Sequence, residues 1–185
     1  MRHALLILAA VVMAGCGEAK PDLDRRLLDA AYDNDVAAAR ELIADGADVN
    51  AKDDSEQSAY LIATSEVGPG TELLELTLAN GAEVNAKDSY NGTGLIRAGE
   101  RGFAVICRRL LEAGIDKDHV NRLGWTALLE AVMLGDGGPD HVATVRVLVE
   151  GGVDTSIADR EGVTPLQHAE RRGYAEIASI LRESK

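Results

Sequence analysis

The sequence predicts an all-α fold in which pairs of short helices stack into an elongated solenoid. A glycine-centred element recurs at a period of about 33 residues, and each copy follows a short apolar run. Such self-similarity is typical of stacked repeats, in which each unit buries its apolar face against the next. The four copies are Gly46-Ala47-Asp48-Val49-Asn50, Gly81-Ala82-Glu83-Val84-Asn85, Gly114-Ile115-Asp116 and Gly152-Val153-Asp154.

The first fifteen residues differ from the rest of the chain. Arg2 and His3 give a short basic start, and Ala4 to Met13 is almost purely apolar. The apolar run is shorter than the roughly 20 residues that a membrane-spanning helix needs. We therefore expect residues 1–15 to be a cleaved signal peptide.

The end of this segment, Met13-Ala14-Gly15-Cys16, resembles the lipobox of bacterial lipoproteins. The resemblance implies cleavage before Cys16 and acylation of its thiol and new amino group, which would anchor the chain to a membrane of the cell envelope on its periplasmic side. Gly17 stands where an inner-membrane retention signal would have aspartate, so the outer membrane is favoured. The alternative is an ordinary secretory signal with a chance cysteine.

Composition indicates one acidic domain over residues 22–185, after a short linker over residues 16–21. The formal charge of −12 becomes about −13 once the segment with Arg2 is removed, and this charge disfavours nucleic acid as a partner. An acylated Cys16 leaves Cys107 as the remaining thiol. Cys107 lies on the apolar stripe of a predicted helix, where a cysteine usually behaves as a small hydrophobe.

Each unit is predicted to contain a first helix, a turn, a second helix and an extended loop. A polar residue opens each loop, and a hydroxyl five residues later is placed to cap the first helix. The loop-opening residues are Asp53, Asp88, Asn121 and Asp159, and the capping hydroxyls are Ser58, Thr93, Thr126 and Thr164. The second helix is expected to end three residues before a glycine that adopts a left-handed turn, at Ile43, Leu78, Leu111 and Val149.

This pattern closely resembles the ankyrin repeat. Two segments match the first-helix signature of that family, Gly124-Trp125-Thr126-Ala127-Leu128-Leu129-Glu130-Ala131 and Thr164-Pro165-Leu166-Gln167-His168-Ala169, and the Gly-Ala-Asp-Val-Asn elements match its hairpin. The resemblance covers essentially all of residues 22–185 and implies an ankyrin-repeat solenoid of five units. The expected units are about 22–52, 53–87, 88–120, 121–158 and 159–185.

The two end units and two insertions depart from the pattern. Pro21 stands where the first unit would have a hairpin strand, and Arg182 replaces an apolar residue in the last unit, as terminal caps require. Extra residues around Val67-Gly68 and over Gly135 to Pro139 fall between the two helices of a unit, so they are expected to lengthen surface loops. The acidic segment at 136–140 lacks the ligand spacing of a calcium loop, and a plain turn is favoured.

The sequence contains no candidate catalytic site, metal site or cofactor motif. His119, His141 and His168 lie in three different settings, and none is paired with a Cys, Asp or Glu at metal-ligand spacing on one helix face. No glycine loop is placed to bind phosphate, and no nucleophile elbow is present. His141 coincides with a histidine of the ankyrin consensus, so we expect it to make a structural hydrogen bond. The chain is predicted not to be an enzyme.

A polar column is expected across the stack. Arg97, Glu130 and His168 occupy the same register of successive first helices. We expect Arg97 and Glu130 to form a partly buried ion pair that fixes the register of units three to five. The alternative is that the column is a polar spot on the binding face.

Resemblance to ankyrin proteins also places a binding surface, the concave face, which is made by the hairpin tips and the exposed side of the first helices. Unit four presents apolar side chains there, with Tyr90 from unit three and arginines on either side, a composition typical of an interface hot spot. The alternative is that Trp125 and Leu123 pack on the next hairpin. The expected partner-binding residues are Tyr90, Arg101, Arg122, Leu123, Trp125, Met133, Leu134, Arg160 and Arg171.

The predicted function is a non-enzymatic, membrane-anchored protein–protein interaction module of the bacterial envelope. We expect a monomer that binds a protein partner and neither nucleic acid nor a cofactor. One alternative is an inhibitor or immunity protein that neutralises an envelope-acting toxin or enzyme. Another is a support factor for a periplasmic enzyme, such as a peroxide-detoxifying one, which is a role of some envelope ankyrin proteins.

Overall fold

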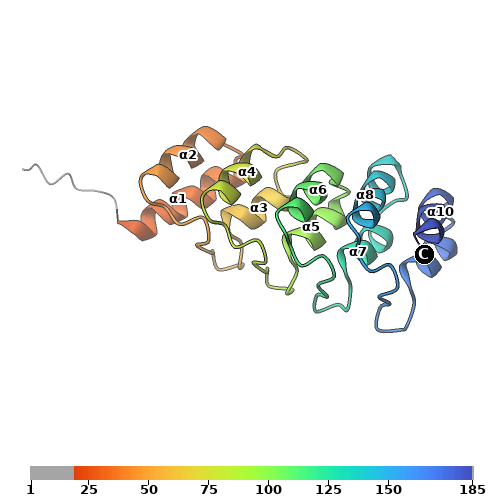
Figure 1. The fold of residues 1–185 in the computed structure, drawn as a ribbon. Coiled ribbons are helices and arrows are strands. Elements are labelled where there is room, and N and C mark those ends of the chain that lie inside the picture. The colour runs from red at the N-terminus through yellow and green to blue at the C-terminus, as the bar shows by residue number, and fades with distance from the viewer. Residues whose placement is uncertain (1–18, 185) are drawn as a thin grey trace, which may run out of the picture.

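The computed structural model describes residues 19–184, and these residues form ten helices arranged as five successive pairs (Figure 1). Within this range the backbone forms one isolated antiparallel β-bridge, between Lys87 and Thr93, and no β-strand. The helices are α1 Lys20–Tyr32, α2 Val36–Ala44, α3 Ala59–Ser65, α4 Glu72–Ala79, α5 Gly94–Arg101, α6 Ala104–Glu112, α7 Ala127–Met133, α8 Pro139–Glu150, α9 Pro165–Arg172 and α10 Ala175–Glu183. The predicted all-α solenoid is confirmed.

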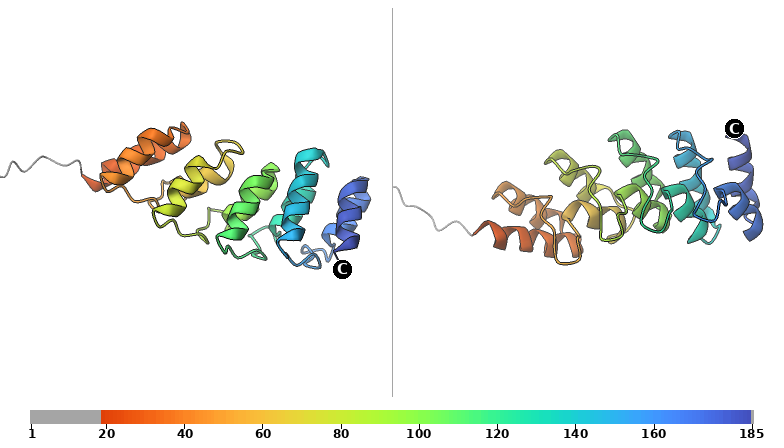
Figure 2. Two further views of the ribbon diagram at one scale, coloured as in Figure 1. Left: turned by 45° about the horizontal axis from the view of Figure 1, so that its top comes forward. Right: turned by 90° about the horizontal axis from the view of Figure 1, so that it is seen from below.

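The pairs repeat along one direction, as Figures 1 and 2 show. The odd-numbered helices form one row, in which α1, α3, α5, α7 and α9 contact their neighbours in turn. The even-numbered helices form a second row alongside the first, and the loops project from one side of the stack, at the bottom of Figure 1. The apolar core runs between the two rows, so each unit depends on its neighbours for burial.

The predicted hydroxyls begin the first helices. Ser58, Thr126 and Thr164 are N-caps whose side-chain oxygens accept backbone N–H groups of the first turn, and Thr164 forms a complete capping box with Gln167. Thr93 also occupies the N-cap position of its helix, but its hydroxyl makes no capping bond. Each second helix ends one residue later than expected, and the following glycines adopt positive φ angles. These glycines are Gly46, Gly81, Gly114 and Gly152.

One side-chain oxygen organises each loop. Oδ1 of Asp88 accepts the backbone N–H groups of Tyr90 at 2.9 Å and Gly92 at 2.8 Å. The other loop-opening residues accept from the same two positions: Asp53 from Ser55 and Gln57, Asn121 from Leu123 and Trp125, and Asp159 from Glu161 and Val163. These bonds satisfy amides that the tight loop would otherwise leave unpaired. The bond from the Val163 amide also lowers the pKa of Asp159, because it favours the charged carboxylate.

Polar side chains join each loop to the next. Asn50 Oδ1 accepts from the Glu83 amide at 2.8 Å, and Asn85 Oδ1 accepts from the Asp116 amide at 2.8 Å. Asp24 and Asp118 make the equivalent bonds at 2.7 Å to the amides of Asp48 and Asp154. Because these bonds repeat from unit to unit, they fix the spacing of the loops along the solenoid.

The first helix begins before the expected domain boundary. Lys20 is the first residue of α1 and Pro21 lies in its first turn, where a helix tolerates proline well, so the end of the expected linker is helical. The predicted lipobox and Cys16 lie outside the described residues. Among residues 19–184, no helix has the length and apolar character needed to cross a bilayer.

Cys107 and the insertion before α8 behave as the sequence predicts. Cys107 is fully buried, and burial raises the pKa of its thiol to about 12, so it is a small hydrophobe rather than a thiolate. The inserted segment folds as a turn, in which Asp136 accepts from the Gly138 amide at 2.8 Å and lies 3.1 Å from Nδ1 of His141. His141 makes its expected structural bond through Nε2, 3.1 Å from the Glu100 carbonyl oxygen.

Close packing of α5 against α7 gives the first testable prediction. A Cβ atom at Gly99 would lie 2.7 Å from the carbonyl oxygen of Ala127, which is shorter than any ordinary contact. Gly99→Ala should therefore destabilise the protein by roughly 1 to 3 kcal/mol, although alanine alone would favour the helix by about 1 kcal/mol. Urea denaturation monitored by circular dichroism measures the change.

Gly70→Ala is the matched control. Its Cβ atom would approach only the flexible carboxylate end of Glu72, at 3.0 Å. We expect a change of less than about 0.5 kcal/mol. A stabilised Gly99→Ala variant would contradict the close approach of the two helices.

Candidate functional site

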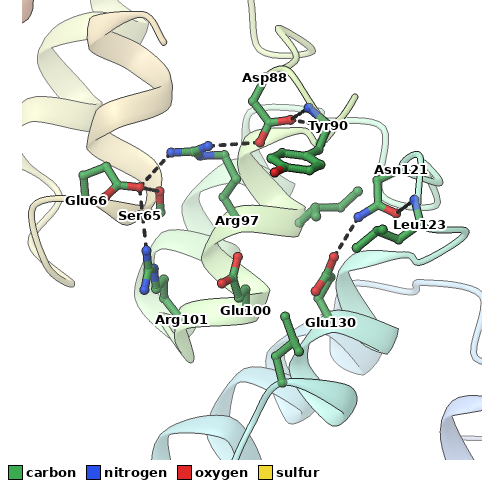
Figure 3. A pocket seen from close by; sticks show the side chains of 13 residues that line it. Ser65, Glu66, Asp88, Tyr90, Arg97, Glu100, Arg101, Asn121, Leu123 and Glu130 are labelled. Atoms are coloured by element: carbon green, nitrogen blue, oxygen red, sulfur yellow. Dashed lines mark hydrogen bonds and ion pairs between the residues drawn. The ribbon is translucent and has the colours of Figure 1, made fainter. Parts of the chain in front are cut away.

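A pocket of about 300 Å³ opens on the concave face, where α3, α5 and α7 meet the loops of units three and four. Figure 3 shows its side chains converging from these three helices and from the loop segments around Asp88 and Asn121. The lining residues are Ser65, Glu66, Asp88, Tyr90, Gly92, Ile96, Arg97, Glu100, Arg101, Asn121, Leu123, Glu130 and Leu134. The surface formed by these residues is called the groove pocket below.

Apolar side chains form the mouth of the groove pocket. Six large apolar side chains are exposed within residues 19–184, and three of them, Tyr90, Leu123 and Leu134, line this one pocket. Their exposed fractions are 65%, 48% and 52%. Exposed apolar groups that gather around a concave, polar-floored site are typical of binding surfaces.

Arg97 forms the charged network on one side of the pocket. Its two terminal nitrogens lie 2.9 Å from Glu66 Oε1 and 3.0 Å from Asp88 Oδ2, and its side chain is 11% exposed. Arg101 lies 3.8 Å from the same Glu66 oxygen. The expected ion pair between Arg97 and Glu130 is therefore wrong. The side chain of Arg97 turns toward the loop of its own unit and toward unit two (Figure 3).

Glu130 occupies the other side of the pocket and has a different partner. Its Oε1 accepts a hydrogen bond of 2.7 Å from the Asn121 amide group, its Oε2 is buried without a partner, and the residue is 3% exposed. Burial raises the pKa of Glu130 to about 7, and the negative charges of Glu100 and Asp88 add to the shift. The loss of hydration of a buried carboxylate is the main cause.

The polar column is present, but each member binds the loop-opening residue of its own unit. Arg97 binds Asp88, Glu130 binds Asn121, and Nε2 of His168 lies 2.6 Å from Asp159 Oδ2. Where the loop opens with an aspartate, the column residue of that unit donates to its carboxylate. Where the loop opens with Asn121, the column residue Glu130 accepts from its amide. In unit two the column residue is Ile62, and the hydroxyl of Tyr32 binds Asp53 instead, at 3.1 Å.

The structure brings together four of the nine expected partner-binding residues. Tyr90, Arg101, Leu123 and Leu134 line the groove pocket. Trp125 and Met133 are half-buried and do not line it, and Arg171 is exposed on α9. Arg122 and Arg160 are exposed, but their guanidinium groups bind backbone carbonyls of the preceding loops, at Ser89 and Arg122. These two arginines therefore connect successive loops.

Asp88 and Asn121 were predicted from the sequence only as loop-opening residues, and their place in the lining of the groove pocket was missed. A signal was present in the spacing, because each loop-opening residue precedes its column residue by nine positions: Asp88 and Arg97, Asn121 and Glu130, Asp159 and His168. Within residues 19–184, no group of three or more His, Cys, Asp or Glu side chains is arranged to hold a metal ion.

Comparison with known proteins decides the family. A family model described as ankyrin repeats (3 copies) matches residues 60–159. The chain belongs to the ankyrin-repeat family. The Escherichia coli K12 ankyrin repeat protein YahD is 36% identical over 146 residues, which cover 78% of this chain and 72% of that relative.

Two further relatives show how widely these ankyrin repeats are shared. The crystal structure of an ankyrin repeat domain from Acinetobacter baumannii AYE superposes with a TM-score of 0.80 and 44% identity, covering 85% of this chain and 80% of that one. Human cyclin-dependent kinase 4 inhibitor B is 30% identical over 118 residues, which cover 48% of this chain and 85% of that protein. Ankyrin repeats are protein–protein interaction modules and are typically non-enzymatic.

The buried carboxyl of Glu130 gives a prediction about stability and pH. Its pKa lies above the ordinary 4.5 of a glutamate, so the folded protein holds a proton that the unfolded chain releases between about pH 4.5 and 7. The stability linked to this proton is fully present below pH 4.5 and is lost as the pH rises through 7. Glu130→Gln keeps the acceptor for Asn121 and removes the charge, so it should stabilise the protein above pH 7 by roughly 2 to 3 kcal/mol.

The measurement is the free energy of unfolding of Glu130→Gln minus that of the natural protein, from urea titrations at pH 4 to 8. The difference should shrink toward zero as the pH falls below 5. Glu41→Gln, at an exposed position on α2, should show no such dependence. A difference that stays constant with pH would contradict a raised pKa for Glu130.

Proposed function

We propose that this chain is a non-enzymatic, membrane-anchored module of the bacterial envelope that binds a protein partner on its concave face. The observation that carries the proposal is the clustering of Tyr90, Leu123 and Leu134 around the groove pocket. A cluster of exposed apolar side chains is costly in water unless a partner covers it for part of the time. Polar and charged groups surround the cluster, as at the rim of a protein interface.

The rigidity of the surroundings supports a preformed binding surface. The loops that carry Tyr90 and Leu123 are each held by two bonds to a loop-opening side chain, and the Arg122 amide donates to the Tyr90 carbonyl at 3.0 Å. A partner would therefore lose little free energy in ordering these loops. Preorganisation of this kind favours recognition of a folded protein surface.

The membrane anchor is the second part of the proposal, and it is supported by the sequence Ala14-Gly15-Cys16. Cys16 precedes the start of α1 at Lys20 by four residues, a distance of at most about 14 Å of extended chain. An acyl group at Cys16 would hold the N-terminal unit close to the bilayer surface. The remainder of the solenoid leads away from α1 along the stack (Figure 1), so the groove pocket would stay accessible from the periplasm, with the outer membrane favoured.

An inhibitor of an envelope-acting enzyme or toxin is a second candidate, and the acidity of the chain favours it. The formal charge is −12, and the groove pocket contains four carboxyl side chains. An acidic concave surface is complementary to a basic active-site cleft, and such complementarity accelerates association. The human relative is named as a kinase inhibitor, which indicates that this scaffold is compatible with inhibition.

The groove pocket gives a prediction about partner binding. Leu123→Glu and Leu134→Glu place a charge at exposed positions, so folding should be preserved while partner affinity falls by at least about 2 kcal/mol, the scale of interface hot spots. Affinity for the partner, captured by crosslinking from its native envelope and then purified, is measured by calorimetry. Thermal melts of the same variants confirm that they are folded.

Val105→Glu is the matched control for these variants. Val105 is 59% exposed on α6, outside the groove pocket, and its replacement should leave partner affinity unchanged. Equal losses of affinity in all three variants would indicate a non-specific effect of added negative charge. Unchanged affinity in Leu123→Glu and Leu134→Glu would place the interface elsewhere on the solenoid.

The anchor is tested separately. Cys16→Ser should remain unacylated, because serine lacks the thiol that receives the acyl chain, and the protein should leave the membrane fraction. Metabolic labelling with a radioactive fatty acid and fractionation of the envelope measure both effects, with Cys107→Ser as the control thiol. A Cys16→Ser variant that is processed at the same site and still fractionates with membranes would contradict the lipoprotein assignment.

A further inference from the structure

We propose that the groove pocket receives an arginine side chain of the protein partner, with Glu100 and Glu130 as its counter-charges and Tyr90, Leu123 and Leu134 around its aliphatic stem. That the arginine comes from a protein partner rests on the proposed function. That the pocket prefers a guanidinium group is independent of that function.

The charges of the pocket are unbalanced. Its lining contains four carboxyl side chains, Glu66, Asp88, Glu100 and Glu130, and two guanidinium groups, Arg97 and Arg101. The two arginines both lie next to Glu66, and Arg97 also binds Asp88. Their positive charge is therefore matched by Glu66 and Asp88, on the side of the pocket toward unit two. A free anion would meet arginines that already have carboxylate partners, so a cationic ligand is favoured.

The two remaining carboxyl groups lack cationic partners. Glu130 lines the pocket and is only 3% exposed, and its Oε2 is buried without a hydrogen-bond partner. Glu100 makes no side-chain hydrogen bond or ion pair within the described residues. The two carboxyl groups lie on adjacent helices, α5 and α7, and face the same space in Figure 3. A buried acceptor without a partner is costly, and a donor from a ligand would remove that cost.

The shape and composition of the mouth favour arginine among cations. A side chain that enters between Tyr90, Leu123 and Leu134 would bury a stem of methylene groups against them before its charged end reached the carboxyl groups. A guanidinium group is planar, donates in several directions at once and stacks on aromatic rings such as that of Tyr90. It can therefore bind both carboxyl groups together, whereas an ammonium group is more strongly hydrated and loses more on entry.

The ionisation of Glu130 is consistent with such a ligand. The pKa of Glu130 is raised because burial and the neighbouring charges of Glu100 and Asp88 disfavour its charged form. A guanidinium group at Oε2 would supply the missing positive charge and favour the carboxylate. The free pocket is therefore preorganised for a cation that the chain itself does not provide.

The probe is n-butylguanidinium chloride, which represents the arginine side chain, and the comparison ligand is n-butylurea, which has the same shape without the charge. Each is titrated at pH 8 into the full chain labelled with carbon-13 at leucine methyl and glutamate carboxyl groups. We expect saturable NMR shifts of Glu130, Leu123 and Leu134, with butylguanidinium binding about tenfold more tightly than butylurea, as charge-assisted hydrogen bonds imply. Equal affinities would overturn the assignment of a cation site.

A matched pair of variants identifies the group responsible. Glu130→Gln keeps the bond to Asn121 and is expected to fold, and it should reduce the preference for butylguanidinium to about twofold or less. Glu41→Gln removes one negative charge from an exposed position on α2 and should retain the tenfold preference. An unchanged preference in Glu130→Gln, or an equal loss in both variants, would overturn the proposal.

The partner itself separates this inference from the proposed function. A partner that is lost from Leu123→Glu and weakened about tenfold in Glu130→Gln supports both. A partner that is lost from Leu123→Glu but binds Glu130→Gln with unchanged affinity overturns the arginine anchor and leaves the concave-face interaction standing. Selective binding of butylguanidinium, with a partner that is indifferent to Leu123→Glu, retains the guanidinium site and overturns the proposed function.

Discussion

The structure depends on one repeated interaction, in which the side chain that opens each loop accepts two backbone amides of that loop. Asp53, Asp88, Asn121 and Asp159 all do this with Oδ1, at the residues two and four positions further on. The bonds hold the loop in a shape that returns the chain to the next first helix. Because these four loops close in the same way, each brings the next pair of helices against the previous one, and the pairs bury a continuous core.

The second polar atom of each loop-opening side chain then determines what the neighbouring first helix must supply. Aspartate leaves a carboxylate oxygen, which is satisfied by Tyr32, Arg97 or His168, whereas Asn121 leaves an amide N–H, which is satisfied by Glu130. Asn121 donates to Oε1 of Glu130, and the other oxygen, Oε2, has no hydrogen-bond partner among the residues that the structure describes. The choice of asparagine in unit four therefore produces the most unusual electrostatic feature of the groove pocket, a buried carboxyl group with a raised pKa.

The same arrangement separates stability from recognition along the solenoid. The apolar core and the hydrogen bonds between successive loops hold the concave face in place, while Tyr90, Leu123 and Leu134 are exposed on it. A surface of this kind can change its exposed residues without loss of the stack, which is why one repeat scaffold has many partners. The groove pocket is thus a local specialisation of units three and four on a shared framework.

The sequence by itself determined the period, the helix pairs, the caps and the turns, because each depends on residues close together in the chain: Thr164 before its helix, Gly152 after another, and Asp159 five residues before Thr164. It also placed Tyr90, Leu123 and Leu134 on one face, since the register of a repeat fixes which side chains point the same way. Only the tertiary structure decided the partners of the polar column. Arg97 and Glu130 share a register, but the long side chain of Arg97 can turn either along the stack or toward the loop of its own unit. It turns toward its own loop, where the largely buried carboxylate of Asp88 accepts its hydrogen bond. Because Arg97 binds Glu66 and Asp88, Glu130 has no cationic partner among the residues that the structure describes.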